Sequence, residues 1–109
     1  MVSRRLPVGF SPKSRQDLLD IGDYIARDSR ANARRFVDRL TEQCAPIGGA
    51  PLAYPARDDL AAGLRMAPLG RYLIFFRVSD QLVRIERVLH AARDLQTLFA
   101  HEGSVSGRD

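Results

Sequence analysis

The first third of the chain changes from an alternating apolar pattern to a helical one. Residues 6–10 alternate apolar side chains with Pro7 and Gly9, which predicts a short strand at a sheet edge, because proline has no N–H to donate. Ser11-Pro12 then provides a favoured N-cap and first helical residue. Apolar residues spaced by three and four predict one helix before residue 28 and a second over residues 31–45. The connection is short, so the two helices should form an antiparallel hairpin.

The second half of the chain predicts strands. A loop of roughly 15 residues, with prolines and glycines between positions 46 and 55, leads to a short strand at Leu64–Met66, followed by a turn at Pro68 and Gly70. Residues 72–78 are almost continuously apolar, which is typical of a strand buried on both faces, and residues 82–89 form the last strand. Tight turns make these strands antiparallel.

The order of elements predicts the α+β class. We expect an N-terminal strand, then an antiparallel helical hairpin packed on one face of a mostly antiparallel four-stranded sheet, with the other face open. The length of 109 residues allows one domain, over residues 1–100. Residues 101–109 are a polar C-terminal tail.

Alternation along the last strand raises a question about Arg87. Strict alternation places Val83, Ile85, Arg87 and Leu89 on one face, which we interpret as the core side. An arginine in that position requires a carboxylate or carbonyl partner. Asp17 and Asp94 are the candidates, and we expect Arg87 and Asp17 to form a structural ion pair.

Composition narrows the possible environments and partners. The net charge is +4, and all but one of the 17 basic residues are arginine, which suits an anionic partner but also fits a compositional bias. The single cysteine, Cys44, lies on the apolar side of the second helix, so we expect a buried side chain and neither a disulfide nor a cysteine-rich zinc site. The longest apolar run, residues 72–76, is too short to cross a bilayer. We therefore expect a cytoplasmic protein with no membrane partner, no metal and no cofactor.

Standard catalytic motifs are missing from the sequence. It contains no nucleotide-binding glycine motif, and His90 and His101 are too far apart to form a metal-binding pair. Six of the serines lie in predicted caps, turns or tails, so a Ser-His-Asp triad finds no support; they are Ser3, Ser11, Ser29, Ser79, Ser104 and Ser106. What stands out is a concentration of arginine around the closing strands, with a histidine where the last strand ends. These residues are Arg65, Arg71, Arg77, Arg84, Arg87, Arg93 and His90.

Several short stretches, in order along the chain, carry a family resemblance. They are Phe10-Ser11-Pro12, Asp17-Leu18 with Ile21, Tyr24-Ile25, Ala33 with Phe36, Gly63-Leu64-Arg65, residues 70–78 and residues 87–94. In these stretches the chain resembles the ParE-like toxins of the ParE/RelE superfamily of type II toxin–antitoxin systems. The resemblance implies a small α+β toxin that a ParD-like antitoxin neutralises. It also implies inhibition of DNA gyrase by binding, without a chemical step, and a role in stabilising a plasmid or genome segment.

RelE-like relatives imply a different activity, the cleavage of messenger RNA on the ribosome. In that alternative, Arg65 and Arg84 would supply cations and His90 an acid or base. This sequence has Ala91-Ala92 after His90, where some nuclease relatives carry an aromatic residue, and it has Phe99 rather than tyrosine near its end. We therefore favour the non-enzymatic toxin, and a decayed toxin that retains only its antitoxin contacts stays open. The residues expected to contact the target or the antitoxin are Arg65, Arg71, Arg84, His90, Arg93, Leu95, Leu98 and Phe99.

Overall fold

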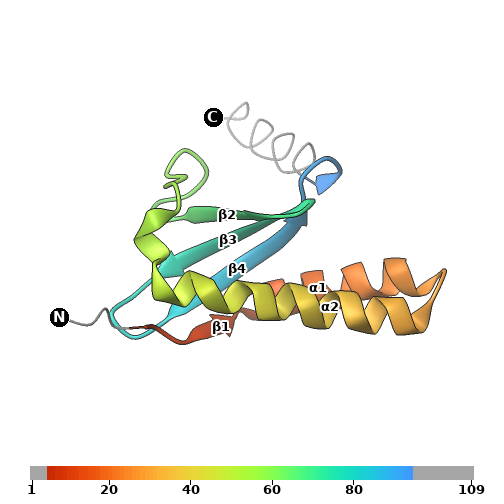
Figure 1. Cartoon of the computed structure of the whole chain (residues 1–109). Helices are drawn as coiled ribbons and strands as arrows, with labels where there is room; N and C mark the ends of the chain where they lie inside the picture. Colours follow the sequence, from red (N-terminus) through yellow and green to blue (C-terminus); the bar gives the residue numbers. More distant parts are fainter. Residues whose placement is uncertain (1–4, 95–109) are drawn as a thin grey trace, which may run out of the picture.

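The computed structural model describes residues 5–94 (Figure 1). Two helices lie side by side along one face of a four-stranded sheet and continue past its edge. Among the described residues, no helix has the length and hydropathy needed to cross a membrane. The elements, in chain order, are β1 (Val8–Phe10), α1 (Pro12–Ala26), α2 (Arg30–Cys44), the 3-10 helices η1 (Ala45–Gly49) and η2 (Pro51–Ala53), β2 (Arg65–Leu69), β3 (Tyr72–Val78) and β4 (Val83–His90).

Serine side chains begin both long helices. The hydroxyl oxygen of Ser11 accepts a hydrogen bond from the Ser14 N–H at 3.0 Å, and Pro12 occupies the first turn, where no N–H is needed. The hydroxyl of Ser29 accepts from the Asn32 N–H at 3.2 Å and begins α2. Both caps are local in sequence, which explains why the hairpin can be predicted from the chain.

The sheet has the strand order β1-β4-β3-β2. β1 pairs with β4 in parallel, with Val8 opposite Val83 and Phe10 opposite Ile85, whereas the other two pairs are antiparallel. This arrangement confirms the predicted α+β class and the mostly antiparallel sheet. Because β1 has three residues and β4 has eight, β1 covers only the first part of the β4 edge.

Both faces of the sheet contribute to the core, which corrects the expectation that one face is open. The larger cluster lies between the helices and the sheet and includes Ile21, Leu40, Ile74 and Phe76. On the other face, Leu64, Phe75 and Leu89 are buried, and the partly buried Leu60 and Ala61 pack on them from the loop before β2. Residues of this chain thus cover part of the sheet face that we expected to be open.

A β-bulge changes the direction of the side chains in the second half of β4. Phe75 pairs with Arg87 and Phe76 pairs with Ile85, so Glu86 is an extra residue on β4. Val83 and Ile85 face the helices, but after the bulge Val88 belongs to that cluster and Leu89 to the opposite one. The prediction that Arg87 and Leu89 share a face with Val83 and Ile85 is therefore wrong, because strict alternation fails at the extra residue, although Leu89 is buried in the cluster on the other face.

The hairpin between β2 and β3 also differs from the expectation. Pro68 lies within β2, opposite Leu73, and not in the turn. β2 is an edge strand, and the Met66 N–H points outward to the carbonyl of Pro55 at 3.1 Å, so the N side of Pro68, two residues later, also points away from β3. The turn itself is at Gly70, which has a φ of 60° that glycine adopts at little cost.

Candidate functional site

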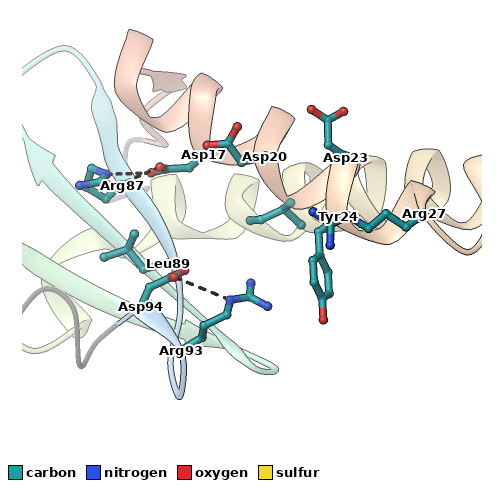
Figure 2. Close-up of a pocket in the computed structure, with 10 residues that line it drawn as sticks. Asp17, Asp20, Asp23, Tyr24, Arg27, Arg87, Leu89, Arg93 and Asp94 are labelled. Carbon is teal, nitrogen blue, oxygen red and sulfur yellow. Dashed lines mark hydrogen bonds and ion pairs between the residues drawn. The ribbon is translucent and has the colours of Figure 1, made fainter.

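A groove of about 630 Å³ runs between α1, the second half of β4 and the turn that follows β4 (Figure 2). It lies where β1 has ended, so α1 and not a strand borders this part of β4. The groove combines an apolar floor with charged groups of both signs. Its lining residues are Asp17, Asp20, Ile21, Asp23, Tyr24, Arg27, Arg87, Leu89, Arg93 and Asp94.

Asp17 forms one end of the groove and takes the place of a neighbouring strand. Its Oδ2 accepts from Arg87 Nε at 2.8 Å and from the Val88 N–H at 2.9 Å, and its Oδ1 accepts from Arg87 Nη2 at 3.0 Å. The fork geometry orients the guanidinium, and the hydrogen bonds to Asp17 raise the pKa of Arg87 above its usual range. Asp17 and Arg87 thus satisfy the open edge of β4 and join it to α1.

Tyr24 forms the other end of the groove, between two arginines. The guanidinium carbon of Arg27 lies 5.4 Å from the centre of the Tyr24 ring, and that of Arg93 lies 4.9 Å from it. Tyr24 remains 53% exposed. Arg93 also approaches Asp94, with its Nε 3.8 Å from the carboxylate (Figure 2). These contacts join the turn after β4 to α1 and leave two cations and an aromatic face at the surface.

His90 is bound into the turn that closes the groove. Its Nδ1 accepts from the Arg93 N–H at 3.1 Å, and its own N–H donates to Asp94 Oδ2 at 2.8 Å. The imidazole packs edge-to-face on Tyr72, with the ring centres 5.3 Å apart. These contacts hold the imidazole against the turn and engage its Nδ1.

Arg65 and Arg84 lie on opposite faces of the sheet. Arg65 pairs with Phe76, whose side chain faces the helices, and its Nη1 donates to the carbonyl of Tyr54 at 2.7 Å. Arg84 pairs with Arg77 on the other face, where both lie within 4 Å of Glu86. These two arginines therefore cannot act on one phosphate together.

The remaining predicted contact residues are spread over the molecule. Arg71 is exposed in the β2–β3 turn, and its carbonyl accepts from the Ala91 N–H at 2.8 Å, close to His90. Leu95, Leu98 and Phe99 lie outside the described residues. The groove thus contains Arg93 from the predicted contact set, together with the predicted ion pair Asp17–Arg87. Sequence reasoning missed Tyr24 and Arg27, although their spacing of three residues on one helix was a usable signal.

No cluster of three or more His, Cys, Asp or Glu side chains within residues 5–94 could hold a metal ion. Cys44 is fully buried in the cluster between the helices and the sheet. Burial raises the pKa of the Cys44 thiol to about 11, because it destabilises the thiolate.

We predict that Cys44 does not react with a thiol reagent in the folded protein. At pH 8 the raised pKa leaves little thiolate, and the side chain has no exposed surface. Labelling with iodoacetamide should proceed in 6 M guanidinium chloride and be at least about 100-fold slower without denaturant. Equal rates in the two conditions would contradict the buried position.

Comparison with known proteins identifies the family. Over residues 8–95 the chain matches the family described as the ParE toxin of the type II toxin–antitoxin system parDE, and it belongs to that family. Its fold is similar to that of a chain of the chromosomal ParDE toxin–antitoxin system from P. aeruginosa, with a TM-score of 0.68 and 22% identity over 79% of this chain and 96% of that chain. It is also similar to a chain of the RelBE2 toxin–antitoxin complex (Rv2865-2866) from Mycobacterium tuberculosis, with a TM-score of 0.60 and 27% identity over 80% of this chain and 99% of that chain. No curated protein matches the chain. The predicted family and the type II toxin class are thereby confirmed.

Proposed function

We propose that this type II toxin is neutralised by a cognate ParD-like antitoxin and acts by binding DNA gyrase, without cleaving RNA. Membership of the ParE family supports the antitoxin partner, and both structural neighbours come from toxin–antitoxin systems. The choice of gyrase as the target rests on the resemblance to ParE-like toxins, which implies inhibition of gyrase by binding. Gyrase and an antitoxin are cytoplasmic partners, so the proposal places the toxin in the cytoplasm.

The observation that carries the non-enzymatic mechanism is the separation of the three nuclease candidates. RNA cleavage through a 2′-hydroxyl needs an acid, a base and a cation around one phosphate. Arg65 and Arg84 lie on opposite faces of the sheet, as their strand partners require. His90 pairs with Tyr72, the first residue of β3, whereas Arg65 pairs with Phe76 further along that strand. The Nδ1 of His90 already accepts a hydrogen bond. This arrangement supports action through a binding surface.

Two assays performed together test the target. Purified toxin should cause gyrase-dependent cleavage of supercoiled plasmid DNA, and antitoxin added at an equal molar amount should abolish it. Primer extension on RNA from cells expressing the toxin should show no discrete cuts in messages. Discrete cuts inside coding regions, without gyrase-dependent DNA breakage, would establish the ribosome-dependent nuclease instead.

We predict that His90→Ala retains toxicity. The substitution removes the acceptor for the Arg93 N–H and the contact with Tyr72, which should lower the free energy of unfolding by about 1–2 kcal/mol. His90→Asn is the matched variant, because its carbonyl oxygen can accept the same hydrogen bond but cannot act as an acid or base. Growth arrest on induction should persist in both variants. A loss of activity by about 100-fold in both, with folding intact, would instead assign a catalytic role to His90.

A further inference from the structure

Two cations meet at one exposed aromatic ring in the groove. Arg27 has no carboxylate within 4 Å among residues 5–94, and the contact of Arg93 with Asp94 is long at 3.8 Å. Asp94 also accepts from the His90 N–H at 2.8 Å, so its charge is shared. Two like charges held at the ring of Tyr24 repel each other, and an anion placed beside them would relieve that repulsion.

The charged groups divide the groove into two sides. Asp20 and Asp23 also line the groove, but Figure 2 shows their carboxylates pointing away from the Tyr24 ring, so the ring and its two arginines form a basic side. Ile21 and Leu89 line the groove as apolar neighbours of this side. An apolar group together with a carboxylate therefore fits better here than a cation does.

The Val88 and His90 N–H groups on the β4 edge beside the groove already have acceptors within this chain. The Val88 N–H donates to Asp17 and the His90 N–H donates to Asp94. A chain segment that added to β4 as a strand would have to displace both carboxylates. Contacts in this groove must therefore come mainly from side chains.

We propose that Tyr24, Arg27 and Arg93 form a docking site for an acidic, partly apolar segment of the antitoxin. The inference rests on the proposed antitoxin partner and locates where it binds. A carboxylate of the segment lies between the two guanidinium groups, and a neighbouring apolar side chain packs on the exposed ring. The net charge of +4 favours the approach of an acidic partner, and a segment that folds on binding can follow the open groove.

A charge reversal tests the site. The variant R27E/R93E replaces both cations, and the control R34E/R39E makes the same charge change at two exposed arginines of α2 that have no ion pair among the described residues. The probe is the purified protein encoded by the reading frame next to this gene, with binding measured by calorimetry. We expect the Kd to rise about 100-fold for R27E/R93E and less than about 5-fold for R34E/R39E.

Further variants separate a direct contact from a loss of folding. Tyr24→Phe keeps the ring and should bind as the parent does, whereas Tyr24→Ala should weaken binding about 10-fold. Thermal unfolding must show that each variant remains folded at the assay temperature. If R27E/R93E is unfolded, R27Q/R93Q replaces it and should weaken binding about 10-fold. Equal weakening by R27E/R93E and R34E/R39E, or no weakening by either, would overturn the docking site. If the parent chain itself does not bind, the proposed antitoxin partner fails instead.

Discussion

Asp17→Ala should lower the free energy of unfolding by about 3–5 kcal/mol, the range for breaking a buried ion pair by removing one partner. The side chain of Asp17 is 10% exposed and receives three hydrogen bonds. Its loss leaves the Val88 N–H without an acceptor and the Arg87 guanidinium without a counter-charge. The higher helix propensity of alanine offsets only about 0.7 kcal/mol of this cost.

Asp20→Ala is the control for this experiment. Asp20 is an exposed aspartate one turn further along α1, and its Oδ1 accepts a hydrogen bond from the side-chain amide of Gln16 on the same helix. Its replacement should change stability by less than about 0.5 kcal/mol in the same urea titration. Arg87→Ala should cost less than Asp17→Ala, about 2–3 kcal/mol, because the Asp17 carboxylate that remains still accepts from the Val88 N–H, so no backbone group loses its partner. If Asp17→Ala and Asp20→Ala unfold at the same urea concentration, Asp17 does not hold the β4 edge.

The elements of this fold can be predicted because their signals are local. Ser11-Pro12 and Ser29 begin the two helices, and the apolar run over residues 72–78 becomes the buried β3. The direction of side chains on β4 could not be predicted in the same way. The bulge at Glu86 depends on how β4 pairs with β3, and one extra residue reverses the face of every residue after it.

Only part of the candidate site could be predicted from the sequence, because its contacts also depend on how distant segments pair. A charge search can suggest Asp17 as a partner for Arg87, but the Val88 N–H needs an acceptor only because β1 ends at Phe10. Arg93 meets Tyr24 across a separation of 69 residues, so no local pattern predicts that contact. The separation of Arg65 from Arg84 likewise depends on strand register, and the sequence showed only that both are arginines near strands.

Gly48→Ala should also destabilise the protein strongly, by about 3 kcal/mol, as expected when an atom is forced into a fully packed position. A Cβ at Gly48 would overlap the backbone carbonyl oxygen of Leu6 and lie 3.3 Å from a methyl group of Val8. The backbone cannot move aside freely, because the Leu6 N–H donates to the Gly48 carbonyl at 2.9 Å and the chain then continues into β1.

Gly49→Ala provides a matched control in the next residue of η1. Its Cβ would meet only the guanidinium end of Arg5, at 3.4 Å, which is flexible and can shift. We expect Gly49→Ala to change the free energy of unfolding by less than about 1 kcal/mol, because alanine restricts the unfolded chain more than glycine does. Thermal and urea unfolding of the two variants measure the difference directly. A Gly48→Ala protein as stable as Gly49→Ala would show that the segment before β1 is not held against η1, and that the parallel pairing of β1 with β4 does not depend on this contact.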